Sequence, residues 1–536
     1  MALRGPYPAK FTQPRMWMKR DLRNSGGNMK KETMRCWFGW IAAVVLCVTL
    51  AIPIRVAGQE AKKGHHYYKL FDLGTFGGLN SYLSYPLPSE VQLNRRGMVV
   101  GIADTPNPDP YSPNCLVSEC ALAHALQWRK GVLTDLGALP GNNNSYAFAS
   151  NDLGVIVGIS ENGVIDPLTG FPEVDGVIWM DGKILDVGTL GGNGSFTGNV
   201  NRWGQVVGAA LNNVPDSFAG GLAIPPFFPV ATQMHAFLWQ NGKMHDLGTL
   251  GGPDSQAQFV NVWGQVAGQS YTNSVVNPGT GIPTEDPFLW QQGRMIDLGT
   301  LGGTLGYANW LTQGGQVVGT SNLAGDTTHH AFLWERGKLR DLGTLGGNNS
   351  EAWFANDEGE VVGRADISTS STNHHAFVWK NGVMADLGTV AGQPLSTAEG
   401  INSKGQIVGD SNGNGWLWEN GSIVDLNSLV LPGATVHVAG AAAINDRGEI
   451  VAAGLPPDGR EHVILLIPCD QDHVDVEGCD FETVEATATA SINSAQVAQA
   501  LAMTVSQPKV SASHMIVQIP SLRTNRTRRI GSLPQK

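Results

Sequence analysis

The residues of this chain that could do chemistry recur in a fixed order. A polar side chain, a tryptophan four positions later and an aspartate seven positions beyond that return along the sequence, as in His235, Trp239 and Asp246. Histidine and aspartate serve as acid–base catalysts and as metal ligands. A repeat would hold its copies of such a site apart, however, and eight equivalent acids would be redundant. We therefore expect the aspartate to bond loop amides and the polar residue to bond the backbone.

In this interpretation the recurrent positions are scaffold, and the tryptophan lies in the core, where burial stabilises the fold by ~25 cal/mol per Å². The aspartates are Asp135, Asp186, Asp246, Asp297, Asp341 and Asp386, with related copies at Asp72 and Asp425. The tryptophans are Trp128, Trp179, Trp239, Trp290, Trp334, Trp379 and Trp418. The polar residues are His124, Asp175, His235, Asp286, His330, His375, Asn414 and His462.

The sequence contains no recognisable catalytic or cofactor motif. A nucleophile elbow, a phosphate-binding loop, a Rossmann fingerprint and an HExxH metal motif are all missing. We therefore expect no cofactor and no metal, and no residue can be assigned as catalytic. An enzyme built on this repeat would use unpaired acids of the variable loops, such as Asp216, Asp254 or Glu285, and nothing in the sequence singles one out.

Four tryptophans stand outside the repeated pattern, namely Trp203, Trp263, Trp310 and Trp353. A residue that does not recur in every repeat is not required by the structure that all repeats share. These four are therefore the candidate ligand contacts of the chain, and packing between repeats is the alternative.

Four cysteines form two local pairs outside the N-terminal segment. Cys115 and Cys120 enclose a short loop, and Cys469 and Cys479 bracket an acidic stretch. No CxxC spacing of the kind typical of thiolate metal sites occurs. We predict two disulfides, which form in an oxidising compartment.

The elements that carry these residues are short β-strands. Glycine follows each repeated tryptophan by three residues, which predicts a tight hairpin turn such as Asn241-Gly242. A second mark, with asparagine three residues before glycine and a Val-rich run after it, predicts another hairpin, as from Asn261. Each repeat thus contains four strands, which we call a, b, c and d in chain order.

Four-stranded repeats of about 40–60 residues are typical of a β-propeller, and we predict one over residues 65–468. The chain begins with an isolated d strand at 67–74, and its last repeat ends after strand c at 462–468. The N-terminal strand can therefore complete the last repeat and remove two open edges. This arrangement predicts an all-β propeller of eight blades, with seven blades as the alternative.

The loops differ in length on one face only. The a–b and c–d turns are short, whereas the b–c loops on the opposite face vary. His235 follows Gly208 by 27 positions, and Asn414 follows Gly409 by five. Rigid scaffolds with variable loops often carry binding surfaces. We therefore expect an unidentified glycan or protein ligand at the b–c loop face.

The two ends of the chain differ from the repeats. In the N-terminal region, 1–58, an apolar run at 37–54 follows basic residues, which predicts a secretory signal peptide or, alternatively, a membrane anchor. The C-terminal region, 469–536, is expected to be a disulfide-closed loop and a disordered tail. The net charge of −11 argues against nucleic acid as a partner. We expect an extracellular, periplasmic or cell-surface monomer.

The chain carries the motif HAFLWxxGxxxDLGTLGG, which is nearly intact at 235–252 and 330–347 and is followed by a GQVVG-type strand. Through this motif it closely resembles the HAF-repeat family of bacterial extracellular proteins. The resemblance covers residues 65–467 and implies a secreted or cell-surface repeat protein, and it brings no catalytic residue with it. The sequence therefore favours a binding or scaffold module. A secreted polysaccharide lyase or hydrolase and a purely structural envelope component are the alternatives.

Overall fold

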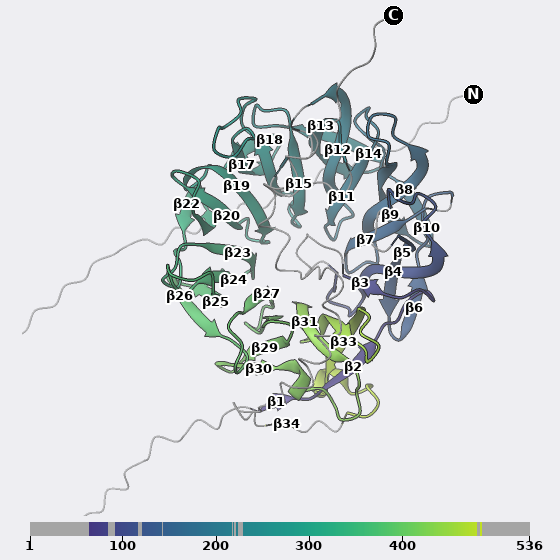
Figure 1. The fold of residues 1–536 in the computed structure, drawn as a ribbon, viewed down its shortest axis with the longest axis vertical. Coiled ribbons are helices and arrows are strands. Elements are labelled where there is room, and N and C mark those ends of the chain that lie inside the picture. Colours follow the sequence, from purple (N-terminus) through teal and green to yellow (C-terminus); the bar gives the residue numbers. More distant parts are fainter. Residues whose placement is uncertain are drawn as a thin grey trace, which may run out of the picture. The chain divides into compact units, whose positions relative to one another are not determined.

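The computed structural model describes residues 64–83, 92–115, 120–141, 143–216, 218, 221–222, 229–479 and 483–484. The predicted signal segment within 1–58 and the predicted tail beyond 484 lie outside these residues. Nearly all regular structure in the described ranges is β-strand. Strands β2–β33 form six four-stranded antiparallel sheets and one eight-stranded sheet, in which a parallel contact between β17 and β19 joins two four-stranded halves, and we describe these halves as separate units. Figure 1 shows these units around a common centre, which confirms the predicted all-β propeller.

The strand bounds follow the repeat closely, and the units are numbered in chain order. Unit 1 consists of β3 (Ser81–Tyr82), β4 (Val99–Pro108), β5 (Ala121–Arg129) and β6 (Val132–Asp135). Unit 2 consists of β7 (Ser145–Ser150), β8 (Ile156–Ile165), β9 (Pro172–Met180) and β10 (Lys183–Asp186). Unit 3 consists of β11 (Ser195–Val200), β12 (Val206–Pro215), β13 (Thr232–Gln240) and β14 (Lys243–Gly248). Unit 4 consists of β15 (Ser255–Val260), β16 (Val266–Tyr271), β17 (Glu285–Gln291) and β18 (Arg294–Asp297).

The second half of the chain repeats the same order. Unit 5 consists of β19 (Gly302–Leu311), β20 (Val317–Leu323), β21 (His329–Glu335) and β22 (Lys338–Asp341). Unit 6 consists of β23 (Ser350–Ala355), β24 (Val361–Asp366), β25 (His374–Lys380) and β26 (Val383–Gly388). Unit 7 consists of β27 (Thr397–Ile401), β28 (Ile407–Asp410), β29 (Gly415–Glu419) and β30 (Ser422–Asp425). Unit 8 consists of β31 (His437–Ile444), β32 (Ile450–Leu455), β33 (His462–Pro468) and the N-terminal β2 (Tyr68–Asp72).

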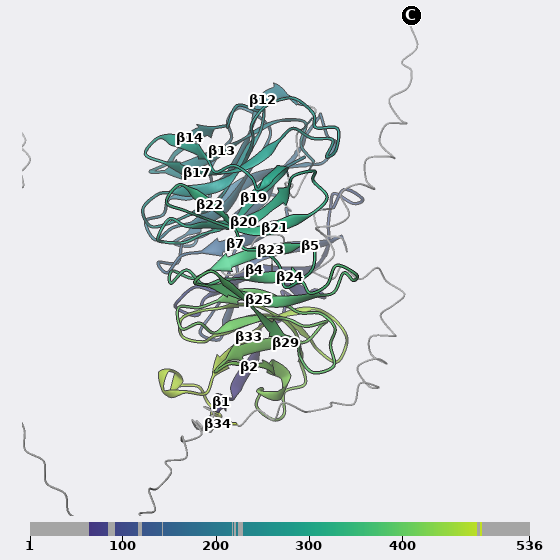
Figure 2. The same cartoon turned by 90° about the vertical axis from the view of Figure 1, so that its left-hand side faces the viewer.

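The first strand of each unit lies nearest the centre and the fourth lies outermost, as β23 and β26 or β27 and β30 show in Figure 1. Figure 2 shows from the side how β23, β24 and β25 succeed one another. The c–d connection is a two-residue turn, in which Asn241 and Gly242 take positive φ angles of 53° and 75°. This is the geometry that a tight hairpin requires.

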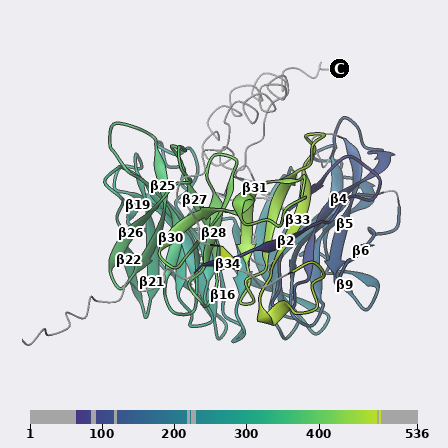
Figure 3. The same ribbon diagram turned by 90° about the horizontal axis from the view of Figure 1, so that it is seen from below.

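The N-terminal strand completes the last unit, as the sequence predicts. In β2, Leu70 pairs with Leu466 of β33 in antiparallel register, and Figure 3 shows the two strands side by side. Two further segments pair in a way that the sequence did not indicate, because β1 (His65–His66) forms a two-stranded sheet with β34 (Thr483–Val484).

The hydrophobic core lies between neighbouring units. Phe237 of β13 and Phe332 of β21 are fully buried at the same repeat position. The b strands approach the a strands too closely for a side chain at the repeated glycine, since a Cβ on Gly208 would lie 1.9 Å from the Phe196 oxygen. The repeated Val-Gly pattern is therefore a packing requirement of the paired inner strands.

Outside the sheets, the described residues contain two short 3₁₀ helices, η2 (Leu426–Ser428) and η3 (Gln471–His473). Within the described ranges, neither helix has the length and apolar character that crossing a bilayer requires.

Candidate functional site

The inner strands differ from unit to unit at two positions, the second and the fourth of each repeated strand a. In units 2, 3 and 8 these positions hold aromatic or small residues, Tyr146, Phe148, Phe196, Gly198, Gly440 and Ala442. In units 4 to 7 they hold mostly polar residues, Gln256, Gln258, Tyr307, Asn309, Glu351, Trp353, Thr397 and Glu399. Four consecutive units therefore present a polar sector on the strands nearest the centre.

An ion pair lies in the middle of this sector. Glu351 of β23 and Arg364 of β24 are cross-strand partners, and the guanidinium donates from Nη2 to Oε1 at 2.8 Å and from Nε to Oε2 at 3.1 Å. Glu351 is only 4% exposed. Burial raises the pKa of its carboxyl, but the charge and hydrogen bonds of Arg364 outweigh burial and hold that pKa far below its ordinary value.

An indole and a phenol adjoin the ion pair. Trp353 donates from Nε1 to Oε2 of Glu351 at 3.0 Å, and the Arg364 guanidinium lies 5.3 Å from its ring centre. Tyr307 of β19 is close enough to both charged residues for their charges to act on it, and burial raises the pKa of its phenol. Trp353 and Tyr307 are both partly exposed, so each can meet a ligand.

A neutral carboxyl completes the group. Burial, followed by the nearby charge of Asp410, raises the pKa of Glu399 in β27 to about 8. The Thr397 hydroxyl donates to Oε1 of Glu399 at 3.0 Å. At neutral pH, Glu399 therefore keeps its proton and can both donate and accept a hydrogen bond. We call Tyr307, Glu351, Trp353, Arg364 and Glu399 the inner cluster.

Two histidines place the inner cluster at the b–c loop end of the strands. His329 begins β21 and bonds Oε1 of Glu351 at 3.2 Å through Nε2. His374 begins β25, and burial and the charge of Arg364 lower its pKa, so that its ring is neutral at pH 7. Both residues follow a b–c loop directly, so these loops border the inner cluster.

Buried amides extend the polar sector into unit 4. Gln256, Gln258 and Gln269 are each at most 2% exposed, and Gln256 pairs with Gln269 across β15 and β16. Both polar atoms of the Gln258 and Gln269 side chains lack a hydrogen-bond partner among the described residues. An unpaired buried polar group costs about 1–3 kcal/mol, so these amides have unused capacity to bond water or a ligand.

Two of the acids that the sequence analysis named as candidates for an enzyme, Asp216 and Asp254, form a pair. Asp254 is fully buried and accepts a bond from the Met234 amide at 2.8 Å. Burial, followed by the hydrogen bond with Asp216, raises the pKa of Asp254 to about 8, so Asp254 keeps its proton at neutral pH. Glu285, the first residue of β17, is also fully buried. Neither Asp254 nor Glu285 presents an open carboxylate.

The recurrent histidines and aspartates join strands c and d of one unit. In His235 and Asp246, Nδ1 lies 2.9 Å from Oδ2, while Oδ1 accepts the Gly248 amide at 2.7 Å. The same pair recurs as His124–Asp135, His330–Asp341, His375–Asp386 and His462–Asp72. Asp186 and Asp297 accept the corresponding glycine amides at 2.7 Å. These contacts lie within single units and give the residues a local structural role.

We call this histidine–aspartate contact the clasp. Three units depart from it, because Asn414 replaces the histidine in unit 7 and an aspartate replaces it in units 2 and 4. In unit 4, Asp286 replaces the histidine opposite Asp297, and burial and the charge of Asp297 raise the pKa of Asp286 to about 7. In unit 2, Asp175 faces Asp186, and its pKa rises to about 6 by burial, although Asn162 bonds it. In both places two carboxyls meet where other units hold a histidine and a carboxylate.

The seven repeated tryptophans are buried or partly buried in the packing between strands. Trp128, Trp179 and Trp379 are at most 6% exposed. The other four lie less deeply and pack on neighbouring hydrophobic clusters, namely Trp239, Trp290, Trp334 and Trp418.

The four tryptophans outside the repeat lie in three different environments. Trp353 belongs to the inner cluster. Trp310 is a core residue, with its ring 5.2 Å from that of Phe259 and 4.1 Å from that of Phe354, in the two adjacent units. Trp203 and Trp263 are 67% and 76% exposed, and they lie in a–b turns, on the face opposite the b–c loops.

Both predicted disulfides are present, Cys115–Cys120 and Cys469–Cys479. Within the described ranges, no three His, Cys, Asp or Glu side chains lie together in a way that could hold a metal ion.

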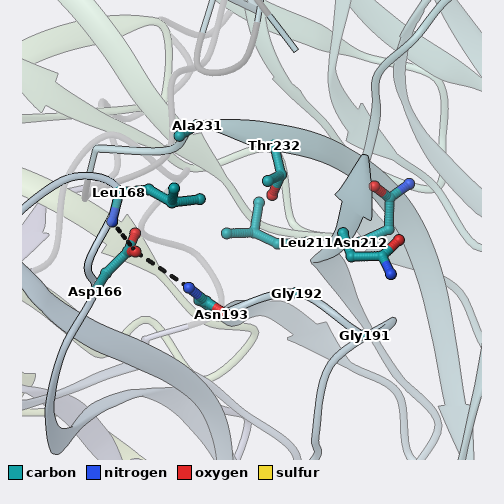
Figure 4. A pocket seen from close by; sticks show the side chains of 10 residues that line it. Asp166, Leu168, Gly191, Gly192, Asn193, Leu211, Asn212, Ala231 and Thr232 are labelled. Atoms are coloured by element: carbon teal, nitrogen blue, oxygen red, sulfur yellow. Dashed lines mark hydrogen bonds between the residues drawn. The ribbon is translucent and has the colours of Figure 1, made fainter. Parts of the chain in front are cut away.

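A small hollow of about 120 Å³ lies at the b–c loop end of units 2 and 3, between Asp166, Asn193 and Thr232 (Figure 4). Asp166 is occupied by its own loop, because Oδ1 accepts bonds from the Leu168 amide at 2.8 Å and the Asn193 side chain at 3.1 Å.

The sequence did not reveal the inner cluster, although it contained a signal. The two variable positions of strand a turn polar in four neighbouring units while the rest of the strand keeps its pattern. Comparing these positions across the repeats would have found Tyr307, Glu351 and Glu399.

Comparison with known proteins gives no family. No family model matches the chain, and no curated protein matches it. A solved structure of Trypanosoma rangeli sialidase in complex with the inhibitor DANA is 10% identical, with a TM-score of 0.24 over 58% of this chain and 52% of that chain. The sialidase in complex with sialic acid is 11% identical, with a TM-score of 0.22 over 63% of this chain and 56% of that chain. The chain thus spans about half the length of these structures, and no residue role is transferred from them.

Proposed function

We propose that this protein is an exported binding module that holds a neutral glycan at the inner cluster, on the b–c loop face of the propeller. The observation that carries the proposal is the convergence of a phenol, an indole, an ion pair and a protonated carboxyl on strands from three consecutive units. These groups are Tyr307, Trp353, Glu351–Arg364 and Glu399.

The charge of the cluster favours a neutral ligand. The carboxylate of Glu351 neutralises the positive charge of Arg364 and accepts two hydrogen bonds from it. Glu399 stays uncharged up to a pH of about 8. Asp410, whose side chain accepts the Gly413 amide at 2.9 Å, is tied to its own loop. The groups left for a ligand are therefore hydroxyl, carboxyl and indole, which suit the alternating C–H faces and hydroxyls of a sugar.

The fixed side chains favour binding. The Trp353 N–H is already bonded to Glu351, so the ring does not lose rotational freedom when a ligand reaches it. Preorganised groups lower the entropic cost of association. The b–c loops that precede His329 and His374 can then supply contacts that select one glycan over another.

Export and family membership form part of the proposal. The apolar run at 37–54 supports a signal peptide, and the two disulfides fit an oxidising compartment. The repeated HAFLW motif supports membership of the HAF-repeat family. We propose on these grounds that the protein is exported from the cytoplasm.

The test is a glycan array probed with the full mature chain, followed by calorimetric titration of the ligand found. Wild-type protein is expected to bind neutral oligosaccharides, and Trp353→Ala to lose about tenfold or more in affinity. Capture of a protein partner at the inner cluster with no glycan bound would replace the proposal by its protein-binding alternative.

The second candidate is a polysaccharide-degrading enzyme. It is favoured by one observation, the protonated state of Glu399 at neutral pH, because a general acid must carry its proton at the working pH. Release of new sugar ends from a polysaccharide, abolished by Glu399→Gln while binding persists, would establish the enzyme. Binding without turnover supports the module.

A further inference from the structure

The tight-turn face, opposite the inner cluster, has an apolar stretch of its own. The residue two positions after the marker asparagine or threonine varies among the a–b turns and is Arg96, Leu153, Trp203, Trp263, Gly314, Glu358, Lys404 or Arg447. Since basic, acidic, apolar and glycine residues all occur there, the turn itself demands no particular side chain. The apolar residues nevertheless occupy three consecutive units.

These three side chains are strongly exposed. Leu153 is 69% exposed, Trp203 is 67% exposed and Trp263 is 76% exposed. Large apolar side chains that gather on a surface with no packing role mark interaction sites. We call Trp203, Trp263 and the groove beside them the turn platform.

Both indoles are held in fixed orientations without being buried. Trp203 donates from Nε1 to the Val262 oxygen at 2.9 Å, and Trp263 donates from Nε1 to the Gln313 oxygen at 3.0 Å. Each ring therefore reaches from its own turn to the turn of the next unit. The two rings follow one another along the arc of units 3 to 5 with their faces already oriented.

The groove beside Trp263 has an uncharged lining. It has a volume of about 390 Å³ and is lined by Trp263, Gly264, Gln265, Gln291, Gln292, Gln313 and Gly314. The Gln265 side chain donates to Oε1 of Gln291 at 2.8 Å, which fixes two of the amides relative to the ring. An aromatic face beside several amides offers a C–H contact together with hydrogen-bond donors and acceptors.

We propose that the turn platform is a second binding site, specific for a neutral polysaccharide chain that runs along the two indoles. The lining of the groove beside Trp263 is uncharged, which favours a neutral partner, and two consecutive indoles suit a linear polymer. The Arg202 guanidinium lies 4.8 Å from the ring centre of Trp203, where it can donate hydrogen bonds to sugar hydroxyls. This site lies on the opposite face from the inner cluster and does not depend on the function proposed for it.

The experiment is affinity electrophoresis of the full mature chain in gels that contain a β-glucan, a galactomannan, a xylan or an α-glucan. At least one of these is expected to retard wild-type protein. The variant Trp203→Ala/Trp263→Ala should lose about tenfold or more in affinity for it. Lys404→Ala, at the same turn position in unit 7, is the matched control and should bind as wild type does.

Three results would overturn the turn platform as a glycan site. One is that none of the four polysaccharides binds. Another is that the double variant binds as tightly as wild type while Trp353→Ala loses binding, which leaves the inner cluster as the binding site and removes only this inference. The last is concentration-dependent self-association in size-exclusion chromatography that the double variant abolishes, which assigns the platform to a second copy of the chain.

Discussion

The Asn445 side chain donates from Nδ2 to the backbone oxygen of Asn94 at 3.1 Å, although 351 residues separate them in the chain. The bond belongs to a circuit in which the marker asparagine of one unit donates to the corresponding oxygen of the next. The other donors are Asn94, Asn151, Asn201, Asn261, Asn356 and Asn402. The circuit therefore links the last unit to the first.

The circuit lacks one donor, and restoring it should stabilise the fold. Thr312 stands where unit 5 would have asparagine, and its hydroxyl accepts the Gln316 amide at 3.1 Å. Thr312→Asn is expected to add the bond to unit 6 and raise the free energy of unfolding by about 1 kcal/mol, as measured by denaturant titration.

Removing a donor should have the opposite effect. Asn151 also accepts bonds from the Leu153 and Val155 amides, so Asn151→Ala removes three bonds and should cost about 2–4 kcal/mol. Equal stability of Asn151→Ala and wild type would refute a structural role for the circuit.

The paired carboxyls of unit 4 should make stability depend on pH. The pKa of Asp286 is raised in the folded state to about 7, so the folded protein binds more protons than the unfolded chain between pH 4 and 7. The contribution of Asp286 to the free energy of unfolding is therefore greatest below that window and is lost as pH rises through about 7. Asp286→His restores the clasp to Asp297, and its melting temperature at pH 8 should rise by about 1–3 °C.

The reverse exchange serves as the matched control. His235→Asp places a second carboxyl opposite Asp246, whose present bond from His235 lowers its pKa against the effect of burial. This variant should lose stability at pH 8 and regain part of it at pH 5. An unchanged pH profile in both variants would show that the clasp contributes nothing to stability.

The ion pair of the inner cluster should be strongly coupled. Removing one partner of a buried pair leaves the other charge unpaired and costs about 3–5 kcal/mol, so Arg364→Met should destabilise the protein by this amount. Glu351→Gln combined with Arg364→Met should recover part of the loss, because no lone charge remains. If the two effects simply add in thermal unfolding, the pair is not coupled.

Ligand affinity should depend on the protonation of Glu399. Its pKa of about 8 means that the neutral carboxyl, able to donate to a sugar hydroxyl, is lost as pH rises above this value. Titrations at pH 6 to 9 should show weaker binding at the alkaline end in wild type and a flat profile in Glu399→Gln. A profile that still falls in the variant would assign the effect to another group.

Much of the fold could be predicted because the repeated spacings mark the strands and the turns between them. The fixed spacing from Trp239 to Gly242 predicts the hairpin turn, and the isolated strand at 67–74 predicts the pairing of β2 with β33. The cysteine spacing predicts both disulfides. Each of these features depends on residues that are near in sequence or identical between repeats.

The site was harder to predict because its parts come from different units. Tyr307, Glu351 and Glu399 resemble ordinary variation until the inner strands are arranged around a centre. Trp310 and Trp353 show the same difficulty. Trp310 occupies the position of Phe354 in the repeat and packs in the core, whereas Trp353 stands one position earlier and joins the inner cluster. A difference of one residue places a side chain on the other face of a strand.

The most direct test of the account is calorimetric titration of the full chain with the neutral oligosaccharide that binds best on the array. Wild type and Lys404→Ala should bind with equal affinity, and Trp353→Ala should bind about tenfold or more weakly with its melting temperature retained. Equal affinity in Trp353→Ala and wild type would contradict the assignment of the inner cluster as the glycan site.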